Sequence, residues 1–219
     1  MSLKLRYLLA AGLLVLMQAG AAAQEDNGIP RDVYYLMPDF AEGMVYFNGQ
    51  RPAQGRLNIC AVDNTLRFMD KNGKEMAASD IDNVAMVKID TVTFIHNQGV
   101  FYRFYPVGTG FGIALKREVK TFKGAKQGAY GTTSQTSSIR ESSSMYVDGV
   151  AYNIYGPVPY DVSEILYLYK EEVIYPLNKR NLKRLFPARK ADIDAYFVAG
   201  NTVPETVSDA VSLLRSWAE

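Results

Sequence analysis

The side chains that could support catalysis or hold a metal are few in this sequence. Its 219 residues include one histidine, His96, and one cysteine, Cys60. These numbers exclude an intramolecular disulfide and zinc sites built from four cysteines, two cysteines with two histidines, or three histidines. We therefore expect no metal and no cofactor. Cys60 lies in the strand-like run 57–62, which favours a buried, unreactive thiol.

A hydrolase is one alternative, because His96 could act as the base for a distant serine. Two carboxylate pairs, Asp80 with Asp82 and Asp192 with Asp194, could serve acid–base chemistry. No Gly-x-Ser-x-Gly or Ser-x-x-Lys motif accompanies them. We expect His96 to be exposed in a turn, the first acidic pair to lie in a turn, and the second on the solvated side of a helix. A protein without enzymatic activity is favoured.

Tyrosines gather in the second half of the chain. Four of them fall close together: Tyr146, Tyr152, Tyr155 and Tyr160. A tyrosine ring has an apolar face and a polar tip, which suits stacking on a sugar ring or on another protein. Tyrosine is also a favoured strand residue, so ordinary packing within a sheet is the competing interpretation. These four are the first group of candidate binding residues.

Basic residues form the second group. Residues 170–190 contain seven lysines and arginines against two glutamates, and a helix there would gather the side chains of Lys179, Arg180, Lys183 and Arg184. Such a face could contact an acidic partner or an anionic envelope surface, or could simply be solvated. Over the whole chain 24 basic residues balance 23 acidic ones. Without a strongly basic domain, no nucleic-acid partner is expected.

The first 23 residues have the features of a secretory signal peptide. Lys4 and Arg6 precede an apolar stretch at 7–17, and Ala21-Ala22-Ala23 provides small residues for cleavage. The apolar stretch is too short for a membrane-spanning helix, which needs roughly 20 residues; an uncleaved anchor is the alternative. No later run is long enough to span a bilayer. We expect export to the periplasm or association with the outer membrane.

Residues 24–177 are expected to form an antiparallel β domain. Turn signals recur between short runs of β-branched and aromatic residues, and Asn-Gly or Asp-Gly hairpins of type I′ are expected at Asn48-Gly49, Asn72-Gly73 and Asp148-Gly149. Leu66 and Phe68 alternate with Arg67, which predicts one wet face. Further strands are expected near 84–89, 92–95, 100–105, 111–122, 165–169 and 173–175, with a glycine bend at 108–112.

Residues 178–219 are expected to form helices packed on this sheet. Asn178 can cap a first helix, Pro187 can begin a second that ends at Gly200, and Thr202 with Glu205 fits a capping box for a third. The whole is an α+β fold, predominantly antiparallel β as a barrel, roll or sandwich, with C-terminal helices. Residues 124–144, rich in serine, threonine and glycine, are expected to form a mobile loop, functional or merely disordered.

The chain resembles a family of uncharacterised secreted proteins from Bacteroidota. The resemblance rests on four segments: Phe40-Ala41-Glu42-Gly43, Gly55-Arg56-Leu57-Asn58, Gly128-Ala129-Tyr130-Gly131-Thr132-Thr133-Ser134, and Asn181-Leu182-Lys183-Arg184-Leu185-Phe186-Pro187. It implies export and one continuous domain. It implies no catalytic residue, because the family has no assigned activity.

Together these features predict an exported cell-envelope protein that binds another macromolecule or has a structural role. Its partner would be an envelope protein or a glycan. A glycan-binding module and a hydrolase using His96 or an acidic pair are the alternatives. Exposed, coplanar rings of Tyr152, Tyr155 and Tyr160 would favour glycan binding, and a serine within hydrogen-bond reach of His96 would favour the hydrolase.

Overall fold

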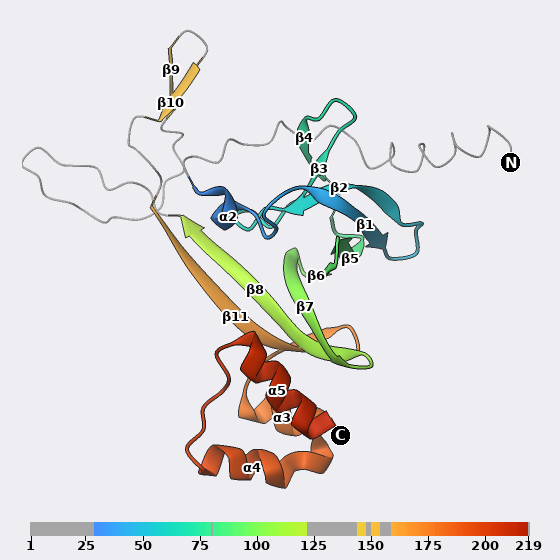
Figure 1. Ribbon diagram of the computed structural model, residues 1–219, viewed down its shortest axis with the longest axis vertical. Coiled ribbons are helices and arrows are strands. Elements are labelled where there is room, and N and C mark those ends of the chain that lie inside the picture. Colours follow the sequence, from blue (N-terminus) through green and yellow to red (C-terminus); the bar gives the residue numbers. More distant parts are fainter. Residues whose placement is uncertain (1–28, 80, 122–143, 148–149, 154–158, 219) are drawn as a thin grey trace, which may run out of the picture.

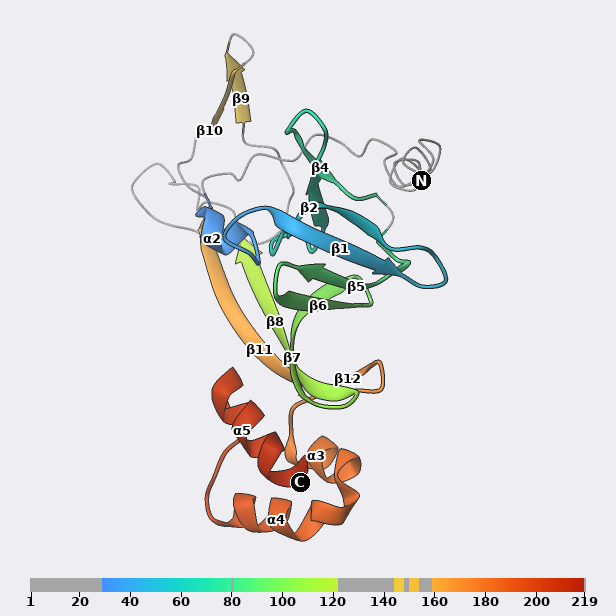
Figure 2. The same cartoon turned by 45° about the vertical axis from the view of Figure 1, so that its right-hand side comes forward.

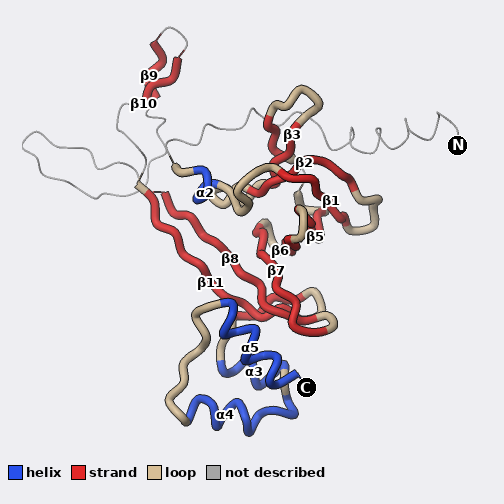
Figure 3. Tube along the Cα trace, in the orientation of Figure 1, coloured by secondary structure: helices blue, strands red, loops and turns tan. Residues whose placement is uncertain are grey.

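The computed structural model describes residues 29–79, 81–121, 144–147, 150–153 and 159–218. The fold is α+β, with a large antiparallel sheet and helices at the C-terminus, as the sequence predicts. Figure 1 shows the C-terminal helices gathered below the strands, and Figure 3 shows the same arrangement by secondary structure, with one short helix among the upper strands.

The sheet has ten strands in the order β12-β11-β8-β7-β6-β5-β1-β2-β3-β4. Their bounds are β1 (Ala41–Phe47), β2 (Ala53–Ile59), β3 (Leu66–Met69), β4 (Glu75–Ala77), β5 (Val84–Ile89), β6 (Val92–Asn97), β7 (Val100–Gly108), β8 (Phe111–Thr121), β11 (Tyr160–Lys170) and β12 (Val173–Pro176). A separate hairpin pairs β9 (Ser144–Val147) with β10 (Val150–Asn153). The strands expected from the sequence are confirmed. Residues 124–143 of the expected loop lie outside the described residues.

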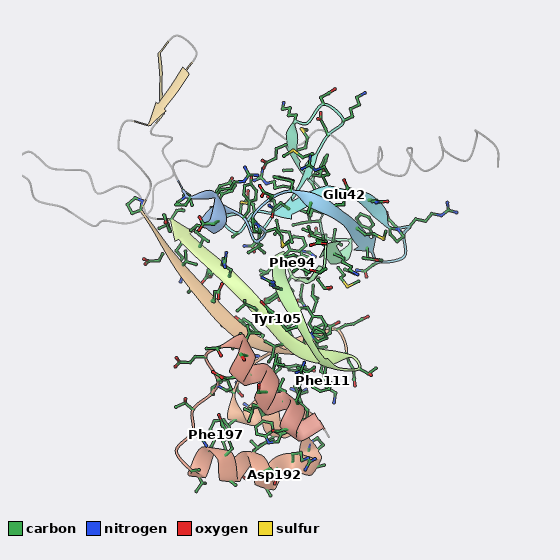
Figure 4. The ribbon with its side chains drawn as sticks, in the orientation of Figure 1. Glu42, Phe94, Tyr105, Phe111, Asp192 and Phe197 are labelled. Carbon is green, nitrogen blue, oxygen red and sulfur yellow. The ribbon has the colours of Figure 1, made fainter. Side chains whose placement is uncertain are left out.

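Two hydrophobic cores share one face of this sheet, which we call the inner face. The strand core contains Phe94 and Phe101 with side chains of β1, β2, β3 and β5. Ile113 and Leu168 are paired across β8 and β11, and the strand pairing places their side chains on the same inner face. They belong to the second core, which the C-terminal helices complete and which we call the helix core. Figure 4 shows Phe94 among the upper strands and Phe111 beside the helices. Strand β7 links the two cores, because Phe101 lies in the strand core and Tyr105 packs against the helix core.

The helices cover the inner face at one end of the sheet, which Figure 2 shows from a second direction. They are α3 (Lys179–Leu185), the 3₁₀ turn η1 (Pro187–Arg189), α4 (Lys190–Val198) and α5 (Val207–Ala218). Their buried side chains pack with Ile113 and Leu168 of the sheet: Leu182, Ile193, Ala210, Leu214 and Trp217. Helix α5 therefore packs on the sheet through Ala210, Leu214 and Trp217.

The helix ends match the sequence only in part. Asn178 caps α3 as expected, because its Oδ1 accepts the backbone N–H of Asn181 at 2.9 Å. Gly200 follows α4 with φ of 86°, the left-handed conformation of a helix end. The predicted capping box at 202 and 205 is wrong. Thr206 caps α5 instead, accepting the N–H of Asp209 at 3.2 Å and donating to its carboxylate at 2.7 Å.

The turns show a similar pattern of success and error. Hairpins form at Asn48-Gly49 and Asn72-Gly73, but only their glycines are left-handed, so the predicted type I′ turn is wrong there. Two successive left-handed residues occur instead at Gln98-Gly99 and Glu171-Glu172. Asp148-Gly149 lies outside the described residues, although β9 and β10 on either side pair as expected. The glycine bend expected at 108–112 coincides with a register shift between β7 and β8.

The N-terminal segment, residues 29–40, contains an unpredicted short helix, α2 (Arg31–Tyr34), and covers part of the outer face. Its backbone pairs with β2: the N–H of Leu36 donates to the carbonyl of Ile59 at 2.9 Å. The buried side chain of Asn58 accepts the N–H of Met37 at 3.1 Å and donates to its carbonyl at 3.0 Å. Both faces of β2 and β3 are therefore covered in this region.

Candidate functional site

Four aromatic rings lie on the outer face of the sheet, opposite the helices. We call Tyr102 and Phe104 of β7 with Tyr167 and Tyr169 of β11 the aromatic strip. The rings of Tyr102 and Tyr167 lie 5.5 Å apart at 85°, and those of Phe104 and Tyr169 lie 5.0 Å apart at 65°. These are edge-to-face pairs. All four side chains are half-buried, so part of each ring remains at the surface.

Strand alternation places the strip on this face. Phe104 pairs with Ala114, which pairs with Tyr167, so the three side chains share one side of the sheet. Their neighbours Tyr105 and Leu168 point to the helix core instead. The strip therefore lies on a surface that the helices α3 to α5 leave uncovered.

Small residues of β8 make room for these rings. Gly112 lies between the strands that carry them, and a Cβ at this position would lie 2.7 Å from Cε2 of Phe104 and closer still to the carbonyl oxygen of Tyr105. A larger residue would displace the Phe104 ring and the backbone. Burial raises the pKa of Tyr102 and of Tyr169, so both hydroxyls stay protonated at neutral pH. The hydroxyls of Tyr102 and Tyr169 therefore add no charge to the strip.

A second cluster, the Arg67 network, lies under the N-terminal segment. Arg67 is 3% exposed, which contradicts the predicted wet face of β3. Its guanidinium forms an ion pair with Asp63 and lies 3.9 Å from the carboxylate of Glu75. Tyr35 donates its hydroxyl to Glu75 at 2.7 Å. The prediction is wrong because residues 29–40 cover the face that strand alternation assigns to solvent.

The protonation states of this network suit a structural role. Burial and the hydrogen bond to Glu75 raise the pKa of Tyr35, which therefore stays a donor. Burial acts to raise the pKa of Asp63, but hydrogen bonds from Thr65 and Cys60 and the charge of Arg67 outweigh it and lower that pKa. Burial raises the pKa of Cys60, which is fully buried and stays a thiol. The network holds the N-terminal segment on the sheet.

The predicted tyrosine group does not form a described platform. Tyr146 and Tyr152 lie on opposite strands of the β9–β10 hairpin, in two cross-strand pairs that follow one another. The structure describes only the backbone of these two residues. Tyr155 lies outside the described residues. Tyr160 begins β11 and packs beside the buried Tyr34 and Tyr35. These positions leave the proposed coplanar arrangement of Tyr152, Tyr155 and Tyr160 an untested prediction.

The predicted basic group lies on α3, but half of it is paired within the chain. Lys179 and Lys183 contact the two carboxylate oxygens of Asp194 at 2.8 and 2.6 Å. These hydrogen bonds lower the pKa of Asp194. The Arg184 guanidinium lies 5.3 Å from the ring centre of Tyr175, and Arg180 is exposed. The lysines join α3 to α4, which reduces the charge that this helix presents to a partner.

The candidate catalytic groups that the structure describes lie on different elements of the fold. His96 lies in β6 and is half-buried, so the predicted exposed turn is wrong; the turn begins at Gln98. Its Nδ1 lies 2.9 Å from the carbonyl oxygen of Val84, and its Nε2 is buried without a hydrogen-bond partner among the described residues. Asp192 lies 3.5 Å from Arg189 on the exposed side of α4 (Figure 4). Asp82 is exposed, and Asp80 lies outside the described residues.

The strip was missed by sequence reasoning, although a signal for it exists. Tyr102 with Phe104, and Tyr167 with Tyr169, are each two residues apart in a strand, and this spacing puts both rings of a pair on one face. The pairing of β11 with β8 and of β8 with β7 then brings the two pairs together. That pairing crosses the long segment between β8 and β11, so the sequence could not supply it.

Within the described residues, no group of three or more histidine, cysteine, aspartate or glutamate side chains is placed to bind a metal ion. None of the helices in that part of the chain is both long and apolar enough to span a membrane. Comparisons with protein-family models, with curated proteins and with solved structures find no match to this chain.

Proposed function

We propose that this chain is an exported, non-enzymatic protein of the cell envelope that binds another protein through the aromatic strip. Export is supported by the leader-like residues 1–23 and by the resemblance to secreted Bacteroidota proteins. Binding is supported by one observation above all: four rings form a half-exposed aromatic surface on a part of the outer face that α3, α4 and α5 leave uncovered, namely those of Tyr102, Phe104, Tyr167 and Tyr169. Tyrosine and phenylalanine are enriched in protein interfaces.

The ring geometry favours a protein partner over a glycan. A sugar-binding platform presents ring faces flat to the sugar, whereas both pairs in the strip are close to perpendicular, at 85° and 65°. Perpendicular rings give an uneven apolar surface that side chains of another protein can fill. Glycan binding is therefore the second candidate, carried by the same rings.

Contacts of the titratable groups support a role without catalysis. The Nε2 atom of His96, which the contact of Nδ1 with a backbone carbonyl leaves unbonded within the described residues, is buried, and Asp194 is held by two lysines. A buried nitrogen and a carboxylate paired in this way are poorly placed to exchange a proton with a substrate. The two arginines exposed on α3, Arg180 and Arg184, would add a peripheral charge contact.

A strip variant tests this function. We expect the double substitution Phe104→Thr and Tyr167→Thr to weaken binding of an envelope protein to the purified chain at least about tenfold, because truncated interface aromatics often cost 2 kcal/mol or more. Threonine keeps the strand preference. Tyr46→Thr is the matched control, since Tyr46 is a half-buried tyrosine on the outer face of β1. The measurement is retention of solubilised envelope proteins on the immobilised chain.

The outcomes separate the two candidates. Retention of a defined protein that the strip variant loses and the Tyr46 control keeps would support the proposal. Strip-dependent binding to isolated wall polysaccharide, with no strip-dependent protein, would favour glycan binding. Equal retention by all three chains would contradict a binding role for the strip.

A further inference from the structure

One edge of β11 has no partner strand over most of its length. β11 pairs with β8 along its whole length, from Tyr160 to Lys170, whereas β12 pairs with only Tyr167–Lys170. No other described strand pairs with residues 160–166 on that side. Figure 1 shows β11 at the margin of the sheet, and we call residues 160–166 the free edge.

The turn after β11 shows which backbone groups point outward. Its two central residues, Glu171 and Glu172, are both left-handed, so Lys170 and Val173 close a two-residue hairpin as a hydrogen-bonded pair. Backbone groups alternate in direction along a strand. Each even-numbered residue of the free edge therefore directs its N–H and C=O away from β8: Tyr160, Val162, Glu164 and Leu166.

The free edge has few of the features that normally protect a sheet margin. Natural edges are short, bulged, covered by another segment, or carry proline or charged side chains, above all lysine. At the opposite margin β4 is only three residues long. The free edge is seven residues long, contains neither lysine nor proline, and keeps an unbroken register with β8. Its charged side chains are two acids, and one of them, Glu164, is held by Arg117 at 2.8 Å.

Exposed apolar side chains coincide with these unpaired backbone groups. Residues 161–165 are all exposed, and among them Val162 is 44% and Ile165 is 37% exposed. Val173, at the start of the adjoining β12, is 45% exposed. Three of the four large apolar side chains that are exposed among the described residues thus lie at this margin. Such a combination is typical of a surface that another strand covers.

We propose that a second copy of this chain pairs with the free edge as an antiparallel strand, with the twofold axis at Ser163. Ser163 is the middle residue, so full overlap places it opposite itself. Val162 then lies opposite Glu164, and Tyr160 lies opposite Leu166, in both halves of the interface. This register pairs apolar Tyr160 with apolar Leu166 twice and sets no like charges directly opposite each other.

Neighbouring registers are less favourable. Centring the axis on Glu164 would set two glutamates opposite each other, and centring it on Val162 would leave Ile165 and Leu166 without partners. Pro159, which has no N–H to donate, ends the paired strand at its N-terminal side. The strand of one copy therefore stops before it meets β12 of the other copy. The free edge is thus complementary to itself, and pairing would join two sheets into one continuous sheet.

Proline scanning tests the pairing. Val162→Pro removes an N–H that points outward, so it should leave the β8 ladder intact and convert a dimer into a monomer in analytical ultracentrifugation. Ser163→Pro removes an N–H directed at β8 and should instead lower thermal stability. Should Val162→Pro unfold the chain, Val162→Lys supplies a charge on the edge for the same test. A monomeric wild-type chain up to its solubility limit, or a Val162→Lys variant that stays dimeric, would overturn the proposal.

A disulfide test locates the axis. In the proposed register Ser163 faces itself at a position without direct hydrogen bonds, where opposite Cα atoms lie about 4.5 Å apart, within reach of a disulfide. Ser163→Cys should form a covalent dimer under mild oxidation. Ser208→Cys, an exposed serine of α5, is the control, and buried Cys60 is out of reach in both. Equal dimer yields from the two variants would exclude this register.

Discussion

Replacing Arg67 with methionine is expected to lower the free energy of unfolding by about 3 kcal/mol, because it leaves the carboxylates of Asp63 and Glu75 without their buried cation. Methionine keeps most of the apolar stem, so the loss reports the charge rather than a cavity. The expected loss is large because Arg67 is only 3% exposed. An ion pair exposed to solvent contributes less than about 1 kcal/mol to the free energy of unfolding. Urea denaturation of both chains provides the measurement.

A second substitution identifies the source of that loss. Adding Glu75→Gln to the Arg67→Met chain should recover part of the stability, because it removes a negative charge left without its buried cation. Lys74→Ala, at an exposed position of the same hairpin, should change stability by no more than about 0.5 kcal/mol. An Arg67→Met chain as stable as the Lys74 control would contradict the role given to the Arg67 network.

Replacing Phe94 with alanine is expected to cost about 3–5 kcal/mol, the range for a large aromatic removed from a packed core. Phe94 is fully buried in the strand core. Trp217, the one tryptophan of the chain, lies in the helix core. Because β7 carries side chains of both cores, the fluorescence of Trp217 should follow the same shifted unfolding transition as the circular dichroism of the sheet.

Phe94→Leu, which keeps most of the apolar volume, should show a smaller shift and serves as the control. A Trp217 transition that stays at its wild-type midpoint while the sheet signal shifts would show that the two cores unfold independently. That result would contradict the expectation that the two cores unfold together because one sheet joins them.

Local rules explain what the sequence predicts well. Turn residues between β-rich runs locate the strands, and Asn178 and Gly200 mark helix ends through backbone hydrogen bonding and a left-handed φ. The same reasoning chooses the wrong cap for α5, because both Thr202 and Thr206 are followed three residues later by an acid. Only the fold decides which threonine begins the helix.

Long-range contacts explain the larger errors. Strand alternation assigns Arg67 to solvent, and the fold buries it beneath residues 29–40, which lie more than twenty positions earlier. The aromatic strip likewise depends on β8 pairing with β11 across a long intervening segment. Alternation shows which residues share a face, but it does not show whether another segment covers that face.

The central claim is that the strip binds a protein in the cell envelope, and crosslinking in intact cells tests it most directly. A photoreactive phenylalanine analogue would replace Tyr167, with the same analogue at Tyr46 as the control. We predict one defined protein adduct from position 167, found in the envelope fraction, lost when Phe104→Thr is added and missing from position 46. Adducts that are the same from both positions, or a chain recovered from the cytosol, would contradict the account.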